Sequence, residues 1–464
     1  MVTTMDDNGV SAIHGGADLR TGADVTGVVE AYGAALGVGA PPGTITVAPN
    51  AGFLSARLPV ADLALGSIGA LATAIDRLRL ARKLPNRPWR LDPERVAASF
   101  GSDKLIRIDG APVNGFAPLS GFFATADGWI RTHANYPHHH RRLLTVLDLP
   151  DNSVAADLAA AVANLSADDV EQRATAAGAL AVRVRTESQW RASMPETSAP
   201  IVEYTATGSI DRAAIIADDP ALPLAGIRVL DLTRVLAGPV AGRDLALLGA
   251  DVLRVDPPQL PEIEWQHTLT GEGKRSTRLD LRSSDDHQLF DELLAGADVL
   301  LTGYRPGALE TWGVDIERPG LVHGSVCAHD PRGPRAGRRG FDSLVQAATG
   351  ISLIEGDADR PGALPVQALD HASGHLLAAG VIDALARRLA DGRGAQVAVI
   401  LERTAEYLLD APGRIASAAP ARIPGERTLV TTGGLTTERP ALVEYDTYPF
   451  AARPLGGDAP RWAQ

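Results

Sequence analysis

The architecture follows from residues 227–255, which read Ile227-Arg-Val-Leu-Asp-Leu-Thr-Arg-Val-Leu-Ala-Gly-Pro-Val-Ala-Gly-Arg-Asp-Leu-Ala-Leu-Leu-Gly-Ala-Asp-Val-Leu-Arg-Val255. A short apolar run at 227–232 predicts a buried strand. The segment 238–248 predicts a helix, with Pro239 in the first turn, where a missing N–H is tolerated. Gly249 ends this helix, and 251–255 predicts a second strand. A strand, a helix and a strand joined by short loops indicate a βαβ unit.

The same alternation continues towards the C-terminus. We predict a helix at 284–295, a strand at 298–301 and a further strand at 321–326. Strands separated by helices form a parallel sheet with right-handed crossovers. We therefore expect an α/β fold with a Rossmann-like parallel sheet and long helices.

The N-terminal half has a different texture. The segment 58–82 predicts a mostly buried helix, and 122–133 predicts a hairpin that turns at Asp127-Gly128. Further helices are predicted near 138–147, 154–164 and 167–177. This mixture indicates a second, smaller α+β domain.

Composition limits the function classes. The 464 residues carry a formal net charge of −12, which argues against nucleic acid or an anionic membrane as partner. No window is apolar enough to span a membrane, and the first residues lack the features of a signal peptide, so we expect a cytoplasmic protein. The single cysteine, Cys327, excludes an intramolecular disulfide and a multi-cysteine metal site.

Two ligand motifs fail on inspection. A dinucleotide fingerprint needs a second glycine in the first βα turn, which reads Ala237-Gly-Pro-Val-Ala-Gly242, but Pro239 stands at that position, although Asp256 does end the second strand. A zinc site at His133 and 138–140 lacks His-x₃-His spacing, because neighbouring histidines on a helix point in different directions. We therefore predict neither an NAD(P) site nor a metal site.

Asp370 precedes an apolar helix that runs to about Leu389, before Gly392. Aspartate is a favoured N-cap, so a purely structural role is one interpretation. The other is a carboxylate nucleophile held at a helix N-terminus. Asp62-Leu-Ala-Leu-Gly66 repeats the pattern of Asp370-His-Ala-Ser-Gly374, and each segment begins an Ala- and Leu-rich helix.

Six ordered blocks resemble family III CoA-transferases, the group that includes formyl-CoA transferase and α-methylacyl-CoA racemase. They span about Gly226 to Ile400. The blocks are Val229-Leu-Asp-Leu-Thr-Arg-Val-Leu-Ala-Gly-Pro239, Leu248-Gly-Ala-Asp-Val-Leu-Arg-Val-Asp-Pro-Pro258, Gly273-Lys-Arg-Ser-Thr-Arg-Leu-Asp-Leu-Arg282, Ala297-Asp-Val-Leu-Leu-Thr-Gly-Tyr-Arg-Pro-Gly-Ala-Leu309, Gly340-Phe-Asp-Ser-Leu-Val-Gln-Ala-Ala-Thr-Gly350 and Leu369-Asp-His-Ala-Ser-Gly374.

The resemblance implies an acyl-CoA:carboxylate CoA-transferase with Asp370 as nucleophile, acting through an aspartyl anhydride and an enzyme thioester. It places Lys274, one of only three lysines, and Arg339 near the adenine and phosphates of CoA. It also places Ala237, Tyr304 and Ala308 on CoA-lining positions. No tightly bound cofactor is implied, because coenzyme A and acyl-CoA are substrates, with a carboxylic acid as acceptor.

Three departures keep alternatives open. Thr302-Gly303 replaces the family's usual Glu-Asn, and Leu236 replaces the glutamine beside the formyl-CoA transferase site. These changes motivate a catalytically silent CoA-binding paralogue and argue against formyl-CoA/oxalate specificity. Phe341 occupies the position of the histidine base in the racemase branch, and phenylalanine cannot abstract a proton, which argues against a racemase or isomerase.

The resemblance also suggests how the chain is divided. We expect a loosely ordered lead-in at 1–45, a partial CoA-transferase-like half at 46–216 and a linker at 217–225. The Rossmann-like domain with the catalytic aspartate follows at 226–400, and a tail at 401–464 packs on the other half. The partial copy lacks its own nucleotide-fold half, so Asp62 is expected to be structural. Family members form interlocked dimers, which leaves a homodimer or a pseudo-dimeric monomer open.

Overall fold

The computed structural model describes residues 11–13, 25–39, 42–194, 199–210, 219–305 and 307–463. A seven-stranded sheet forms the centre of its larger lobe, in the order β12-β11-β10-β13-β14-β15-β9. The strands are β9 (Val202–Ser209), β10 (Arg228–Asp231), β11 (Asp251–Asp256), β12 (Arg275–Arg278), β13 (Val299–Thr302), β14 (Val322–Cys327) and β15 (Arg393–Ile400). Neighbouring strands are parallel except at the β15–β9 edge, which confirms the predicted parallel α/β sheet.

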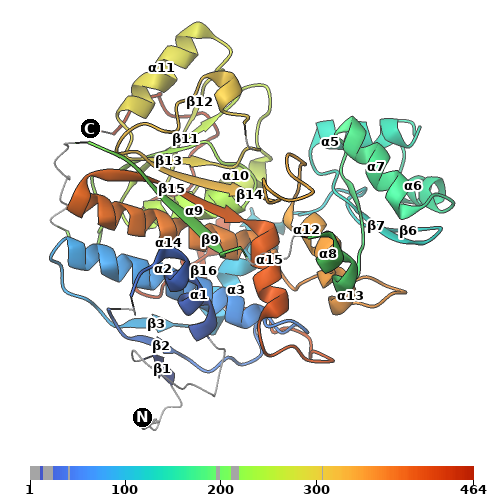
Figure 1. Ribbon diagram of the computed structural model, residues 1–464, viewed down its shortest axis with the longest axis horizontal. Helices are drawn as coiled ribbons and strands as arrows, with labels where there is room; N and C mark the ends of the chain where they lie inside the picture. The colour runs from blue at the N-terminus through green and yellow to red at the C-terminus, as the bar shows by residue number, and fades with distance from the viewer. Residues whose placement is uncertain are drawn as a thin grey trace.

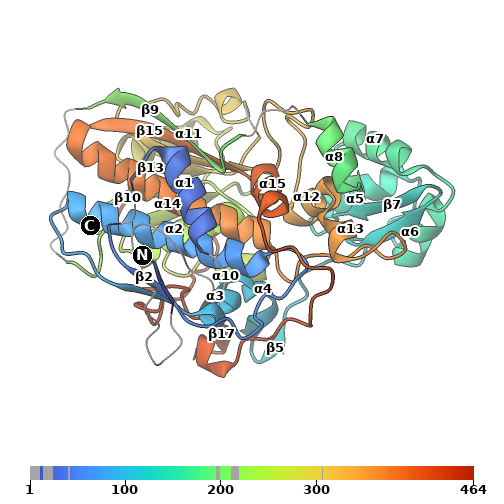
Figure 2. The same cartoon turned by 60° about the horizontal axis from the view of Figure 1, so that its bottom comes forward.

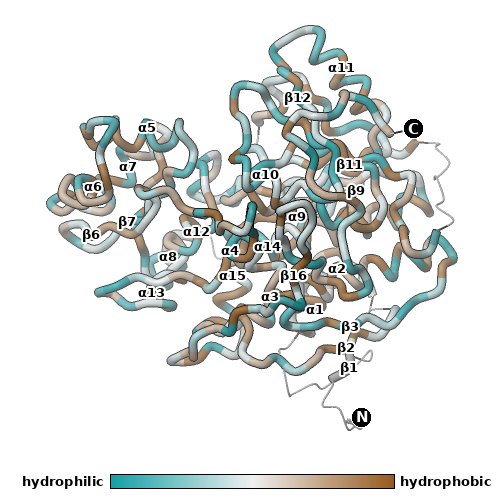
Figure 3. The backbone as a smooth tube through the Cα atoms, turned by 180° about the vertical axis from the view of Figure 1, so that it is seen from behind, coloured by the Kyte–Doolittle hydropathy of each residue, from teal (hydrophilic) through white to brown (hydrophobic). Residues whose placement is uncertain are grey.

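Both faces of this sheet are buried. Val229, Val252 and Val299 pack on one face with helices α9 (Ala237–Leu247) and α14 (Ala368–Asp391). Leu230 and Leu253 point to the opposite face, where they meet Phe290 of α11 (Ser284–Ala295). Successive strand residues alternate between faces, so a continuous apolar run serves both cores. Viewed from behind, α11 alternates between hydrophilic and hydrophobic segments, as expected for a helix with one buried side (Figure 3).

Helix α2 (Val60–Ala81) lies along α14 and adds a further layer beneath the sheet, as Figures 1 and 2 show. The two helices are tied by a buried ion pair between the Arg77 guanidinium and Asp383, with Nε 2.7 Å from the carboxylate. Tyr32 of α1 (Thr26–Leu36) donates to the other oxygen of Asp383 at 2.5 Å. Helix α1 corrects the prediction of a loosely ordered lead-in over its residues, because it packs on α2 and is ordered by that contact. Residues 1–10 and 14–24 lie outside the described residues.

A smaller lobe stands to one side of the sheet (Figure 1). It contains the predicted hairpin, formed by β6 (Phe122–Thr125) and β7 (Gly128–Thr132), with β8 (Ala181–Arg183) beside β7. Helices α5 (Pro137–Val146), α6 (Ala155–Val162) and α7 (Ala167–Ala177) cover this sheet, as predicted, and α8 (Glu187–Ser193) follows. The lobe therefore matches the expected smaller α+β domain.

The remaining elements connect these parts. They are β1 (Ser11–Ile13), β2 (Ile45–Val47), β3 (Trp89–Leu91), α3 (Pro93–Phe100), α4 (Ser102–Leu105), β4 (Arg107–Ile108), β5 (Ala111–Pro112), α10 (Glu264–Thr270), η1 (Glu310–Trp312), α12 (Asp342–Thr349), α13 (Ile351–Glu355), α15 (Leu401–Asp410), η2 (Glu426–Thr428), β16 (Leu429–Thr432) and β17 (Leu435–Glu438). Strand β17 pairs with β4, so the C-terminal segment contacts the N-terminal half. No helix of the described residues is both long and apolar enough to cross a bilayer.

Candidate active site

Asp370 lies in the first turn of α14 and is only 5% exposed. Its backbone N–H donates to Oδ2 of Asp342 at 3.1 Å, and the N–H of Leu369 donates to the same oxygen at 2.9 Å. Among the described residues, no hydrogen bond or ion pair engages the Asp370 carboxylate itself. Asp342 therefore holds the first turn of α14, and the helix N-terminus favours negative charge on the Asp370 carboxylate.

Asp342 is a residue that sequence reasoning missed. It stands in the quoted block 340–350, where no role was assigned to it, and it is the first residue of α12. In the structure it caps a different helix, α14, and Gln346 donates to its other oxygen. Gln346 in turn accepts from the Leu364 N–H at 2.9 Å. Its capping target lies 28 residues later, so no local sequence signal indicated this role.

Burial raises the pKa of Asp370 well above its ordinary value, and the neighbouring Asp342 carboxylate raises it further. Burial also raises the pKa of Asp342 to about 6. Two carboxylates held this close resist simultaneous ionisation, so the pair titrates as a unit. Perturbed acids of this kind are typical of catalytic sites, although buried structural pairs also produce them.

A cavity of about 350 Å³ lies between the smaller lobe and the loop that precedes α12. Its lining includes four arginines, namely Arg305, Arg335, Arg338 and Arg339. Partial burial lowers the pKa of Arg339, and the positive charges of Arg305 and Arg142 lower it further. Four arginines against the single acidic residue of the lining, Glu171, favour the binding of an anion.

Of the other two arginines of the cavity, Arg338 has an acidic partner and Arg335 packs on an aromatic ring. Arg338 pairs with Glu171 at 3.0 Å, and Arg335 lies over the Trp190 ring at 4.5 Å. Sequence comparison had singled out Arg339 alone. Arg305 follows Tyr304 within a block already quoted, so its position in that block was the available signal. Arg339 and Asp342 belong to one short segment, which places the arginine pocket within roughly 10 Å of chain from the Asp370 cap.

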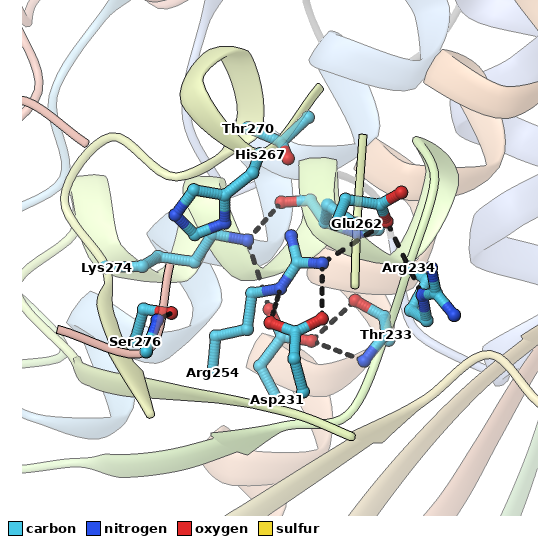
Figure 4. A network of polar contacts seen from close by, with 12 residues as sticks. Asp231, Thr233, Arg234, Arg254, Glu262, His267, Thr270, Lys274 and Ser276 are labelled. Atoms are coloured by element: carbon cyan, nitrogen blue, oxygen red, sulfur yellow. Dashed lines mark hydrogen bonds and ion pairs between the residues drawn. The ribbon is translucent and has the colours of Figure 1, made fainter. Parts of the chain in front are cut away.

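The Lys274 ammonium does not face this cavity. It is 1% exposed and donates to Asp231 Oδ2 and to the Pro239 carbonyl, both at 3.0 Å (Figure 4). Burial lowers its pKa to about 8, which the Asp231 carboxylate opposes. Lys274 thus ties β12 to the end of β10 in the interior, and the structure does not present its charge to a CoA phosphate.

Ala237 begins α9, after a loop held by Glu262. The loop residue Val235 has a φ of 71°, a left-handed conformation that a β-branched residue rarely adopts. Its N–H donates to Glu262 Oε2 at 2.9 Å, and Tyr136 of the smaller lobe donates to Oε1 at 2.5 Å. Burial alone would raise the pKa of Glu262, but Arg254 and Arg234 outweigh it and hold the pKa at about 2 (Figure 4).

The remaining candidate residues are placed as follows. Tyr304 is partly buried and meets Trp312 edge-on at 5.5 Å, and burial raises its pKa to about 12. Ala308 is partly buried four residues further on. Thr302 bonds His323 at 2.9 Å. None of Ala237, Lys274, Tyr304 and Ala308 lines the arginine cavity, which brings together Arg339 and Arg305 instead.

Two histidines of the predicted cluster, His133 and His139, pack against Phe341. The His133 ring stacks on Phe341 at 3.8 Å, and His139 meets Phe341 edge-on at 5.8 Å. Burial lowers the pKa of both His133 and His139 to about 3, so both rings are neutral. No cluster of histidine, cysteine and acidic residues suited to a metal ion is found within the described ranges.

Residues 224–432, just under half of the chain, match the family model of CoA-transferase family III. This part of the chain is similar to that family. A relative from Mycobacterium tuberculosis, named probable fatty acyl-CoA transferase Rv3272, is 35% identical over 196 residues, or 38% of this chain and 49% of the relative. The succinyl-CoA–D-citramalate CoA-transferase of Chloroflexus aurantiacus is 35% identical over 193 residues, or 38% and 48%.

A crystal structure of Rv3272 aligns with a TM-score of 0.38 and 36% identity, covering 40% of this chain and 55% of that one. A CAIB/BAIF family protein from Brucella suis aligns with a TM-score of 0.38 and 29% identity, covering 41% and 56%. The chain spans about half the length of the curated relatives it matches.

Proposed function

We propose that the protein is an acyl-CoA:carboxylate CoA-transferase whose nucleophile is Asp370. One observation carries the proposal: a buried carboxylate stands at the N-terminus of α14, bonded to no described side chain, while Asp342 fixes its backbone. The family match of residues 224–432 and the names of the relatives support the reaction class.

The reaction proceeds by exchange at one carboxylate. An Asp370 oxygen attacks the acyl-CoA carbonyl, the carbon–sulfur bond breaks, and CoA leaves as its thiolate from a mixed anhydride. The thiolate attacks the Asp370 carbonyl of that anhydride and expels the donor acid, which leaves an enzyme thioester. The acceptor carboxylate then attacks the thioester and releases the thiolate, which takes the acceptor acyl group from the new anhydride and restores Asp370.

The chain's own residues position these steps. Burial removes water from around the Asp370 carboxylate, which makes it a stronger nucleophile once it is ionised. Asp342 holds the first turn of α14 in place. The arginine cavity is proposed to take the phosphates of CoA, with Arg305 and Arg339 as the unneutralised charges. A homodimer or a pseudo-dimeric monomer, a cytoplasmic location and a structural role for Asp62 belong to the same proposal.

Mass spectrometry of the intact protein tests the nucleophile. After incubation with a panel of acyl-CoAs, we expect a mass increment that peptide mapping places on Asp370 and that hydroxylamine removes. Asp370→Ala abolishes the increment and lowers turnover by roughly 10³-fold or more. Asp391→Ala, in the same helix, is the control. Tight acyl-CoA binding with no increment and no CoA exchange for any donor identifies the silent paralogue instead.

The position of His133 favours a second candidate function, that of an acyl-CoA racemase or isomerase. Its neutral ring, stacked on Phe341, stands beside the position where the racemase branch carries a base. A racemase or isomerase exchanges the α-proton of its acyl-CoA with solvent deuterium. A transferase with Asp370 as nucleophile transfers labelled CoA without such exchange, so the two activities are separated by one incubation in D₂O.

A further inference from the structure

Arg131 is a cation without an acidic partner. It lies on β7, with its guanidinium 4.8 Å from the centre of the Phe122 ring and 5.2 Å from that of Phe116. Its Nε is buried and makes no hydrogen bond, and no ion pair to Arg131 is found among the described residues. Burial lowers its pKa to about 10, opposed only by the Asp342 carboxylate. Asp342 is the residue that holds Asp370.

The most deeply buried arginines among the described residues differ from Arg131, because each forms an ion pair with an acidic side chain. Arg243 pairs with Glu438 at 2.7 Å, Arg254 with Asp256 at 2.7 Å, and Arg403 with Asp330 at 2.6 Å. An unpaired buried charge is expensive, and proteins normally neutralise it. Arg335 shares the unpaired state of Arg131, but it lines the cavity proposed for the CoA phosphates. Arg131 does not line that cavity, so it has no comparable explanation.

The surroundings of Arg131 supply further unused polar atoms. Phe116, which packs on Arg131, meets His133 edge-on at 6.3 Å, and His133 stacks on Phe341. The Nδ1 atoms of His133 and His139 are buried and make no hydrogen bond. His133 and His139 therefore lie against Phe341, one residue from Asp342, and Arg131 packs on Phe116 beside His133; each of the three side chains has a buried nitrogen without a hydrogen bond. A carboxylate would accept from the guanidinium and from a neutral imidazole N–H.

We propose that Arg131, assisted by His133, binds the distal carboxylate of a dicarboxylic substrate whose other carboxyl group reacts at Asp370. The two phenylalanine rings hold the planar guanidinium in one orientation, which suits two parallel hydrogen bonds to a carboxylate. Because its phosphates are assigned to the arginine cavity, CoA leaves Arg131 free for the acyl or acceptor part. The inference rests on the proposed function, and it deepens it by naming the substrate class as α,ω-dicarboxylic acids and their mono-CoA thioesters.

The test compares acids that differ only in the distal group. Acceptors are α,ω-dicarboxylic acids of three to six carbons and monocarboxylic acids of equal length, assayed with wild type, Arg131→Gln and Arg131→Lys. Wild type should favour the diacids, and Arg131→Gln should lose about 10- to 100-fold in kcat/KM for them, while monoacids change less than about 3-fold. Arg131→Lys keeps the charge without the planar fork and should recover only part of the loss. The control is Arg173→Gln, which removes an exposed ion pair on α7.

The outcome separates the two proposals. Acylation of Asp370 with an unchanged ratio of diacid to monoacid turnover in Arg131→Gln overturns the carboxylate receptor and leaves the transferase intact. If Asp370 is never acylated, titration calorimetry with the same diacids decides: saturable binding to wild type that Arg131→Gln loses supports the receptor. Equal or absent binding to both proteins overturns it. Circular dichroism and thermal melting establish that each variant is folded.

Discussion

The protonation of one carboxyl group governs the chemistry proposed at Asp370. The acid form is a poor nucleophile, and both burial and the Asp342 charge raise the pKa of Asp370, so the neutral form persists to higher pH than in a free aspartate. Acylation is therefore expected to rise with pH as the Asp370–Asp342 pair loses its protons.

Asp342→Asn tests this coupling. Asparagine keeps an oxygen that accepts from the N–H groups of Leu369 and Asp370, but it removes the negative charge. The pKa of Asp370 then falls, so the acidic limb of the acylation profile should move to lower pH. Burial remains, so the shift is partial. Single-turnover acylation measured from pH 4 to 9 checks it, with Asp151→Asn as control, and an unmoved or alkaline-shifted limb contradicts the coupling.

Arg339 and Arg305 are expected to act on CoA affinity rather than on chemistry. Neutralising either one, as Arg339→Gln or Arg305→Gln, removes a charge-assisted hydrogen bond worth about 1.5–3 kcal/mol. The KM for acyl-CoA should rise about 10- to 100-fold with little change in kcat, and acyl thioesters of dephosphorylated CoA should show a smaller effect. Arg173→Gln serves again as the control. A loss confined to kcat would contradict the proposal that the cavity binds CoA.

The sequence placed Asp370 correctly at the start of a helix, because apolar periodicity and a leading acid are local signals. The contacts of the Lys274 ammonium could not be predicted from its neighbours in the sequence. Whether its ammonium meets a ligand or Asp231 depends on a residue on another strand. Asp342 escaped notice for the same reason, since its hydrogen bonds reach a helix that begins after an intervening helix and loop. Arg131 lies in the predicted hairpin, but only the structure shows that it forms no ion pair with any described residue.

At the scale of elements, a close crossing between two helices explains why each copy of the Asp-x-Ala-x-Gly motif contains a glycine. A Cβ on Gly374 would lie 2.5 Å from the Ala237 carbonyl of α9, and a Cβ on Gly66 would lie 2.5 Å from Val28 Cβ of α1. Helix α1 thus crosses α2 as α9 crosses α14. The periodicity of 26–36 was too weak to predict α1, because its stability comes from packing on α2 rather than from propensity.

Gly374→Ala tests the close crossing. The added methyl group meets backbone, so α9 and α14 must separate, and we expect a loss of about 1–3 kcal/mol in the free energy of unfolding. Gly66→Ala should cost similarly through Val28. Gly39→Ala, where no atom lies within 4 Å of the new Cβ, is the matched control. Denaturant melts give the three values, and equal stability of Gly374→Ala and Gly39→Ala would contradict the crossing argument.

At the scale of the whole molecule, the two helices that carry the Asp-x-Ala-x-Gly motif, α2 and α14, differ in what surrounds them. Only α14 is preceded in sequence by the parallel sheet, and Asp370 alone has the Asp342 cap. We therefore expect at most one acyl group per chain under saturating acyl-CoA. Intact mass measurement counts it, and Asp62→Asn should leave the count unchanged. Two groups per chain, or a loss in Asp62→Asn, would give Asp62 a share in the reaction.

Strand β9 gives the chain a further property. It belongs to the N-terminal half by sequence, yet it forms the edge of the C-terminal half's sheet, antiparallel to β15 from Val202 to Ser209. Without it, β15 would expose a row of backbone hydrogen-bonding groups. Residues 25–210 and 219–463, produced as separate polypeptides, are therefore expected to recognise each other and reassemble non-covalently. Such complementation would make β9 a donated strand, and its deletion from the first fragment should abolish reassembly.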